Sequence, residues 1–272
     1  MHAYARIAVA GATGRVGRHV VDILNARGHE VVPMSRSTGV DVVTGEGLSA
    51  ALAGVDCVID VATGPSPDQE PATAFFTAAA RNLQEVGQRA GVRRMVVVSI
   101  IGCDRFAGGY GAAKIAHEHA TLSGPIPAQV LRAAQFHEFV AQLVDWGRQG
   151  EVSYVPKMRT QPVAARNVAE SLVDLATGPR PSVSDALVPE IAGPREESLV
   201  EMAQLLAARR GDPARIEAVS DSADPDHTVY ESGALLPGPH ARLAGPTFSD
   251  WLNSTTPWLA ADVQVSIAAR AR

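Results

Sequence analysis

Short apolar runs alternate with helix-like segments through the first half of the chain. The apolar runs are typical of strands buried on both faces of a parallel sheet. They cover residues 6–10, 29–35, 55–61, 94–101 and 128–132. The segments between them have apolar residues at helical spacing or are rich in alanine, and glycines follow several of them as stop signals. They cover residues 16–26, 48–53, 71–90, 111–122 and 136–148. This alternation predicts an α/β fold with a doubly wound parallel sheet and right-handed crossovers.

The second half of the chain is less regular and richer in proline. A helix is expected after Pro246, with Thr247 as its N-cap. We predict a regular domain at 1–150 and a smaller, irregular region at 151–272 that packs on it as one continuous structural unit. The other elements expected in this region are helices at 167–176 and 198–209 and a strand at 187–192.

Composition excludes several classes of protein. With 272 residues, 46% of them hydrophobic, the chain can bury a core without outside help. The net charge of −5 and the absence of a long basic block argue against nucleic-acid binding. No stretch approaches ~18 consecutive apolar residues, so no membrane span is expected. Residues 1–10 predict a first strand rather than a signal peptide, and with only Cys57 and Cys103 the expected location is the cytoplasm.

A glycine-rich turn follows the first predicted strand and opens the first predicted helix. Gly11 would make the tight turn, Gly14 would let a diphosphate approach the backbone, and Gly17 would let helix and strand pack closely. A helix N-terminus offers free N–H groups and partial positive charge to phosphates. The position of the three glycines between strand and helix therefore predicts a dinucleotide site.

The end of the second predicted strand indicates which dinucleotide binds. An acidic residue there would bind the ribose 2′-hydroxyl of NAD, but this chain has Ser35, Arg36 and Ser37. A guanidinium flanked by hydroxyls suits a 2′-phosphate, because arginine can pair with it bidentately. NADPH is therefore the predicted cofactor. Asp41 and Val42 are expected beside its adenine.

Three further side chains suggest reduction chemistry. Tyr110 and Lys114 share one face of a predicted helix. A nearby ammonium, together with the cofactor ribose, would lower the pKa of a tyrosine from about 10, so that its hydroxyl could donate a proton to a carbonyl oxygen. Ser99, at the carboxyl end of the fourth predicted strand, would hydrogen-bond the same oxygen.

With these motifs the chain resembles the short-chain dehydrogenase/reductase (SDR) superfamily, in particular its atypical, NmrA-like branch. The resemblance implies a Rossmann-type fold, a catalytic set of Ser99, Tyr110 and Lys114, and a second role for Lys114 in holding the nicotinamide ribose. The matching segments are GATGRVG (11–17), VVVSIIG (96–102), YGAAK (110–114), LRAAQFHEFV (131–140), QPVAARNVAE (161–170), IAGP (191–194) and LLPGPHARLAGPTFSDWL (235–252).

Motifs and resemblance together predict one extended cofactor site. It comprises Gly11, Thr13, Gly14, Arg15, Val16, Gly17, Ser35, Arg36, Ser37, Asp41, Val42, Ala62, Thr63, Lys114 and Ala133.

The substrate side is predicted to include apolar side chains and one histidine. They are Ile101, Phe106, Phe136 and His137. His137 is compatible with a substrate contact or proton donor and equally with the polar start of a helix. Asn82 is interpreted as a packed polar residue, with a role in steadying the cofactor loop as the alternative. The segment 224–227 is interpreted as an ordinary polar turn and Cys103 as structural. His117 and His137 each begin an incomplete HExxH pattern, so no metal site is predicted.

The function predicted from these residues is NADPH-dependent reduction of a small or mid-sized organic carbonyl or quinone. Two alternatives remain open at this point: a non-catalytic NADP(H)-binding regulator that senses redox state, and an epimerase or isomerase that retains its cofactor. The expected partner is a small-molecule substrate, without nucleic acid or membrane. A monomer and a homodimer are both compatible with the sequence.

Overall fold

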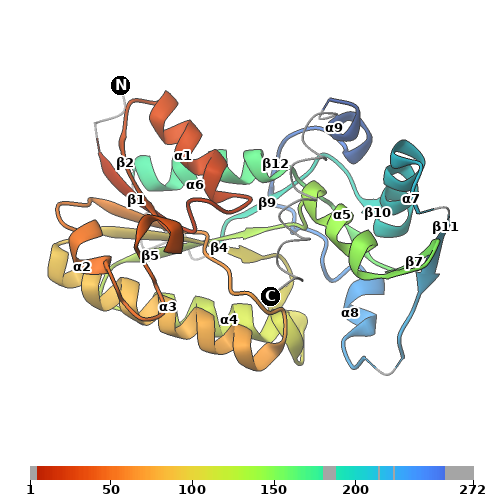
Figure 1. Cartoon of the computed structure of the whole chain (residues 1–272), viewed down its shortest axis with the longest axis horizontal. Helices are drawn as coiled ribbons and strands as arrows, with labels where there is room; N and C mark the ends of the chain where they lie inside the picture. The colour runs from red at the N-terminus through yellow and green to blue at the C-terminus, as the bar shows by residue number, and fades with distance from the viewer. Residues whose placement is uncertain (1–4, 180–187, 214, 223, 255–272) are drawn as a thin grey trace.

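A seven-stranded parallel sheet forms the centre of the molecule, with the strand order β12-β9-β5-β4-β3-β1-β2 (Figure 1). The structure is a computed structural model that describes residues 5–179, 188–213, 215–222 and 224–254. The sheet contains β1 (Arg6–Ala10), β2 (Glu30–Met34), β3 (Cys57–Asp60), β4 (Arg94–Ile100), β5 (Ala128–Ala133), β9 (Glu190–Ala192) and β12 (Arg242–Leu243). The predicted Rossmann-type fold is therefore confirmed.

Helices cover both faces of this sheet. On one face α1 (Gly17–Ala26) packs beside α6 (Ala165–Thr177) (Figure 1). The other face carries α2 (Leu48–Ala51), α3 (Gln69–Ala90) and α4 (Gly109–Leu122). Each face has its own apolar core, because the strands place alternate side chains on opposite sides. This double covering explains why the strands are almost uninterrupted apolar runs.

The chain leaves the centre of the sheet in two opposite directions. From β1 it passes to β2 at one edge, whereas β3, β4 and β5 follow on the other side of β1. In open parallel sheets, ligands bind at the carboxyl ends of the strands beside such a reversal. The fold thus assigns the turns after β1 and β3 to the ligand-binding edge.

The rest of the chain builds a smaller region beside β5. It packs around a third apolar core that includes Val140, Leu206 and Phe248. Its helices are α5 (His137–Trp146), α7 (Leu199–Arg210), α8 (His227–Glu231) and α9 (Phe248–Ser254). Its strands form two small sheets, β11-β7-β6 and β10-β8, made of β6 (Arg148–Gln149), β7 (Val152–Pro156), β8 (Arg159–Thr160), β10 (Glu197–Ser198) and β11 (Arg215–Val219).

The regular first half follows the sequence prediction, and the second half follows it in part. The helices predicted at 167–176 and 198–209 are present as α6 and α7. The helix predicted at 136–148 ends at Trp146, because Arg148 and Gln149 pair with β7 instead. Strand β7 was not predicted, since one of its two buried positions holds Ser153, beside Val155 at the other, while Tyr154 is 37% exposed. Of the strand predicted at 187–192, Leu187 lies outside the described residues, and the strand begins at Glu190.

The helix expected after Pro246 is present as α9. Thr247 caps it as predicted: its hydroxyl oxygen accepts the Asp250 amide at 3.2 Å and its hydroxyl donates to the Asp250 carboxylate at 2.7 Å. Within the described ranges, none of the helices combines the length and hydropathy that crossing a lipid bilayer requires.

Candidate active site

The residues predicted to bind cofactor gather along the carboxyl edge of the central sheet. Gly11 follows β1, Ser35 follows β2, Thr63 lies just beyond β3, Ile101 follows β4, and Ala133 ends β5. Because these five strands are parallel neighbours, the ends meet along a single edge. The fold therefore brings together positions that are far apart in the sequence.

Backbone contacts that only glycine permits close the turn between β1 and α1. Gly11 has a φ of +78°, and a Cβ there would lie 2.7 Å from the Cα of Ala62. A Cβ on Gly17 would lie 2.0 Å from the carbonyl oxygen of Gly11, whereas one on Gly14 would lie 3.1 Å from it. The Gly11 amide also donates to the carbonyl oxygen of Met34 at 3.0 Å. Main-chain atoms of the strands on either side thus pack directly against the turn, as the spacing of the glycines predicts.

The N-terminus of α1 is open toward this turn. Val16, the N-cap residue of α1, provides no side-chain cap, and Thr13 and Gly14 are exposed. Amides at such an end attract anions, so the cradle fits the diphosphate of a dinucleotide. Arg15 donates from Nη2 to the side-chain oxygen of Gln142 on α5 at 3.2 Å. Arg15 therefore connects the turn to the second half of the chain.

The segment after β2 folds as a short 3₁₀ helix, η1 (Arg36–Thr38). The Ser35 amide donates to the Thr38 hydroxyl at 2.9 Å, and the hydroxyls of Ser35 and Ser37 lie 2.8 Å apart. The Arg36 side chain is exposed, and in the part of the chain that the structure describes it forms no ion pair. Its charge is consequently available to an anionic ligand beside the glycine turn.

A side chain from α3 holds the loop expected beside the adenine. The Asn82 amide donates to the carbonyl oxygens of Val42 at 3.0 Å and of Val43 at 2.7 Å. The Asp41 carboxylate accepts the Val43 amide at 2.7 Å. Of the two interpretations of Asn82, the contacts favour the alternative in which its amide steadies this loop, over the preferred one of a merely packed polar residue.

Tyr110 lies in the first turn of α4, against the ring of Phe76. The two ring centroids are 5.7 Å apart, and the Tyr110 hydroxyl is 3.1 Å from the hydroxyl of Thr63. Burial raises the pKa of Tyr110, and the hydrogen bond with Thr63 offsets only part of this rise. Lys114 does not lower this pKa in the protein alone, and the lowering expected from Lys114 together with the cofactor ribose stays a prediction. The phenol keeps its proton at neutral pH.

Lys114 has partners in the protein interior. Its ammonium donates to the carbonyl oxygen of Val98 at 2.9 Å and to Nδ1 of His117 at 2.8 Å. The Nζ atom also lies 4.3 Å from the centroid of the Phe76 ring. The side chain is buried, and burial lowers the pKa of Lys114 to about 8. Its assignment as a ribose ligand remains a prediction.

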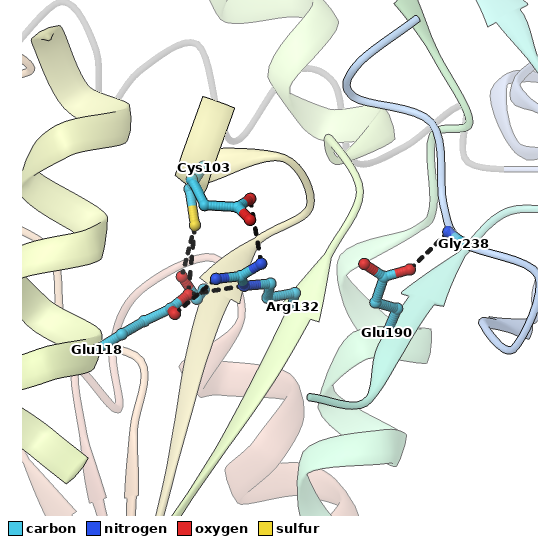
Figure 2. A network of polar contacts seen from close by, with 7 residues as sticks. Cys103, Glu118, Arg132, Glu190 and Gly238 are labelled. Carbon is cyan, nitrogen blue, oxygen red and sulfur yellow. Dashed lines mark hydrogen bonds and ion pairs between the residues drawn. The ribbon is translucent and has the colours of Figure 1, made fainter. Parts of the chain in front are cut away.

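A buried polar network lies behind Ser99. The Ser99 hydroxyl is 3.7 Å from the Cys103 sulfur, which in turn lies 3.3 Å from a Glu118 carboxylate oxygen. Arg132 on β5 donates two hydrogen bonds, of 3.0 and 2.9 Å, to the Glu118 carboxylate and forms an ion pair with Asp104 at 3.2 Å (Figure 2). Hydrogen bonds and ion pairs thus join the end of β4, the turn at Cys103 and Asp104, helix α4 and strand β5.

This network changes the interpretation of Ser99. Its side chain is only 2% exposed, and its hydroxyl contacts Cys103 and Glu118. The prediction that Ser99 polarises a substrate oxygen does not fit this orientation, since the hydroxyl is engaged inside the core. Burial raises the pKa of the Cys103 thiol to about 11, which agrees with its interpretation as a structural residue.

Asp226, from the second half of the chain, holds the loop that precedes Tyr110. Its carboxylate accepts the amides of Ala107 at 2.7 Å and Gly108 at 3.0 Å. The next amide, that of Gly109, donates to the side-chain oxygen of Gln69 at 2.9 Å. The interpretation of segment 224–227 as an ordinary turn was therefore wrong. No sequence pattern joins Asp226 to this loop, so only the fold could reveal the contact.

We expect Asp226→Ala to release this loop. Loss of hydrogen bonds to a charged acceptor costs about 1.5–3 kcal/mol, so the amides of Ala107 and Gly108 should exchange about 10- to 150-fold faster. Hydrogen exchange measured by NMR checks this result. As a matched control, Gln69→Ala should speed exchange at Gly109 while leaving the other two amides protected. Unchanged exchange at Ala107 and Gly108 in Asp226→Ala would contradict the assignment.

Two of the predicted substrate contacts lie in the interior. Ile101 is 2% exposed and belongs to the core of the sheet. His137 is 1% exposed, donates from Nε2 to the carbonyl oxygen of Pro246 at 3.1 Å, and packs against Phe248 and Trp251. Burial lowers the pKa of His137 to about 4, so the ring is neutral. His137 is the first residue of α5, as its interpretation as the polar start of a helix predicts. Its burial and that of Ile101 do not favour contact with substrate, and the contacts expected of them stay predictions.

The remaining substrate-side residues are half-buried. Phe106 packs edge to face on Tyr230, with ring centroids 5.3 Å apart, and Phe136 is the N-cap residue of α5. Both lie where the second half of the chain meets the carboxyl edge of the sheet. Their contact with substrate stays a prediction.

Comparison with known protein families identifies the first half of the chain. Residues 11–121 match the family described as NAD(P)H-binding. A 3-beta-hydroxysteroid dehydrogenase from Mycolicibacterium neoaurum is 33% identical over 112 residues, which cover 34% of this chain and 31% of the relative. The photosystem II assembly factor Ycf39 from Synechocystis is 33% identical over 110 residues, covering 35% and 34%. The chain thus spans about a third of the length of these curated relatives.

Solved structures resemble the fold over almost the whole chain. MoeE5 in complex with UDP-glucose and NAD superposes with a TM-score of 0.71 at 19% identity, covering 95% of this chain and 99% of that one. A short-chain dehydrogenase/reductase superfamily protein from Agrobacterium tumefaciens with bound NAD has a TM-score of 0.61 at 19% identity, covering 98% and 100%. These structures share the architecture and carry a nicotinamide cofactor.

Proposed function

We propose that the chain, whose residues 11–121 match an NAD(P)H-binding family and whose fold resembles that of a short-chain dehydrogenase/reductase superfamily protein, is an NADPH-dependent reductase of small or mid-sized organic carbonyls or quinones. The observation that carries the choice of cofactor is Arg36. This guanidinium is exposed and without an ion pair in the described ranges, and the hydroxyls of Ser35 and Ser37 flank it. A 2′-phosphate needs such a group, whereas the ribose of NAD calls for a carboxylate.

The site residues have distinct roles in this proposal. The backbone of Gly11 to Gly17 holds the diphosphate, Arg36 pairs with the 2′-phosphate, and Lys114 serves the nicotinamide ribose. Bound NADPH supplies the hydride. Tyr110 supplies the proton at its hydroxyl oxygen, and the raised pKa keeps that proton in place at neutral pH. A protonated phenol is what the reduction of a carbonyl group requires.

The neighbour of the reacting hydroxyl is Thr63 rather than Ser99. The Thr63 hydroxyl lies 3.1 Å from that of Tyr110, so it can orient the phenol or share its proton. This arrangement supports a reaction that depends on Tyr110 and tolerates the burial of Ser99.

We expect Arg36→Ala to weaken NADPH binding while leaving NADH binding nearly unchanged. Loss of a charged hydrogen-bond partner costs about 1.5–3 kcal/mol, which corresponds to a loss of affinity of about 10- to 150-fold. Calorimetric titration with both nucleotides measures this difference. Arg36→Lys, which retains the charge but not the bidentate geometry, should lie between the two proteins. Equal affinities of the unmutated protein for NADPH and NADH would refute the choice of NADPH.

A non-catalytic NADP(H)-binding regulator is the second candidate. It is favoured by the inward orientation of Ser99, which removes one member of the catalytic set that the family resemblance implies. Screening NADPH oxidation against quinones, aldehydes and ketones separates the two functions. A reductase consumes NADPH with at least one carbonyl class, while a regulator binds NADPH without turnover. Turnover of substrate without net cofactor consumption would instead favour an epimerase.

A further inference from the structure

A chain of three buried polar side chains leads away from the proposed ribose ligand. Lys114 donates to Nδ1 of His117 at 2.8 Å, and Nε2 of His117 lies 3.1 Å from a carboxylate oxygen of Asp60. The residues are 4%, 1% and 1% exposed, respectively. They come from two elements, α4 and β3, and the proposed function does not account for His117 or Asp60.

The direction of these hydrogen bonds is fixed by chemistry. An ammonium can only donate, so Nδ1 of His117 must accept and the imidazole proton must lie on Nε2. Nε2 then donates to Asp60, whose other carboxylate oxygen accepts the Ala62 amide at 3.0 Å. Burial and the charge of Lys114 both lower the pKa of His117, so the ring stays neutral. A neutral imidazole thus joins a carboxylate to an ammonium.

The surroundings exclude water from this chain of contacts. The Phe76 ring stacks on His117 with centroids 4.6 Å apart and an interplanar angle of 19°. The same ring lies 4.3 Å from the Lys114 nitrogen. The ionisable groups that act on Lys114 are Asp60 on β3 and, more weakly, Cys103 on η2 (Cys103–Arg105) and Glu118 on α4. Asp60 is thus the main source of negative charge that opposes the desolvation of Lys114.

We propose that Asp60 and His117 are positioning residues that keep Lys114 protonated and aim its ammonium at the ribose of the bound nucleotide. Two of the three N–H groups of Lys114 are engaged, with Val98 and His117. The proposal assigns the third N–H group, which has no hydrogen-bond acceptor among the described residues, to the ribose. The assignment of the ribose rests on the proposed function, whereas the control of the charge on Lys114 rests on the protein alone.

The first test follows NADPH affinity as a function of pH. The charged hydrogen bond requires protonated Lys114, so affinity is greatest below its pKa in the free protein, about 8, and falls above it. Asp60→Asn removes the carboxylate charge and should move this decline about one pH unit lower. His117→Leu removes the hydrogen bonds to Lys114 and Asp60 and should also move the decline in NADPH affinity to lower pH. His117→Gln can still accept from Lys114 and donate to Asp60, so its decline should stay close to that of the unmutated protein.

A destabilising change that does not touch Lys114 serves as the control. Gln84 is buried and binds backbone groups of Thr121 and Ile126 near the other end of α4. Gln84→Leu should lower thermal stability without moving the pH at which affinity declines. If Asp60 and His117 had a purely structural role, their variants would also lose stability without a change in the pH at which NADPH affinity declines. An unchanged pH of decline in Asp60→Asn and His117→Leu would therefore overturn the proposal.

A second measurement needs no nucleotide. The pKa of Lys114 in the folded protein is below its value of 10.5 in a free side chain, so between these two values the unfolded chain binds more protons. The free energy of unfolding therefore gains a contribution that rises with pH from about 8 to 10.5. In Asp60→Asn this rise should begin about one pH unit lower. Lys114→Met removes the titrating group, so adding Asp60→Asn to this variant should not shift the pH dependence of the free energy of unfolding.

The two measurements separate the proposals. Absence of NADPH binding at every pH would refute the proposed cofactor, while the unfolding data would still decide whether Asp60 controls the charge of Lys114. A shift by Asp60→Asn that persists in the Lys114→Met background would overturn the inference, because the titrating group would then be another residue.

Discussion

Tyr110→Phe is expected to lower turnover by about 10²- to 10⁴-fold, the range that a positioned proton donor contributes, with little change in NADPH affinity. The substitution removes one oxygen atom, and the ring keeps its contact with Phe76. Steady-state rates of NADPH oxidation with the best substrate of the screen, together with calorimetric NADPH titration, measure the two effects separately.

The matched control for this substitution is Tyr154→Phe. Tyr154 is 37% exposed on β7, so loss of its hydroxyl should leave turnover unchanged. If Tyr110→Phe retained full turnover, Tyr110 would not be the proton donor. A parallel loss of NADPH affinity would instead indicate that the Tyr110 hydroxyl holds the nucleotide.

Arg132→Met is expected to cause the largest loss of stability among the substitutions considered. Arg132 and Glu118 are 16% and 6% exposed and share two hydrogen bonds (Figure 2). Removing one partner of a buried pair leaves an uncompensated charge, which costs about 3–5 kcal/mol. Denaturant unfolding at neutral pH measures the loss. Arg148→Met, which breaks an exposed pair with Asp212, is the control and should have a much smaller effect.

The pH dependence of this loss identifies Glu118 as its source. In the unmutated protein burial acts to raise the pKa of Glu118, but hydrogen bonds from Arg132, Ser99 and Cys103 and the charge of Arg132 together outweigh it, so the pKa is lowered. That stabilisation is complete above the ordinary pKa of a glutamate and disappears as the pH falls through the lowered value. In Arg132→Met the effect of burial is opposed only by Ser99 and Cys103, so we expect the pKa of Glu118 to rise and acidification to relieve the buried charge. The difference in free energy of unfolding between Arg132→Met and the unmutated protein should therefore become smaller as the pH falls. A difference that stays constant with pH would contradict the role of Glu118.

The first half of the fold could be predicted from sequence because its signals are local. Strand β1 is an apolar run followed by glycine, and the positions of Gly11 and Gly17 follow from backbone contacts that admit no side chain. Such patterns determine a strand, a turn and a helix without knowledge of distant residues. The second half lacked them, as β7 shows with Ser153 inside and Tyr154 outside.

The candidate site was predictable by position but not by orientation. Motif spacing brought Tyr110, Lys114 and Ser99 to one edge of the sheet. Spacing could not reveal that the Ser99 hydroxyl turns toward Cys103, or that Lys114 is held by His117. These orientations depend on buried charges from other elements. Asp226 was invisible for the same reason, since its contact with Ala107 joins residues 119 positions apart.

The order of strands in the central sheet has a practical consequence for dissecting the protein. Strand β9 pairs with β5: the Arg132 amide donates to the carbonyl oxygen of Pro189 at 2.9 Å, and the Ala134 amide to that of Ile191 at 2.9 Å. A fragment that ends at residue 150 would lack β9, so the backbone groups on this edge of β5 would have no strand partner. Unpaired strand edges recruit strands from other molecules and cause aggregation. Fragments meant to report on nucleotide binding alone should therefore retain the chain through β9.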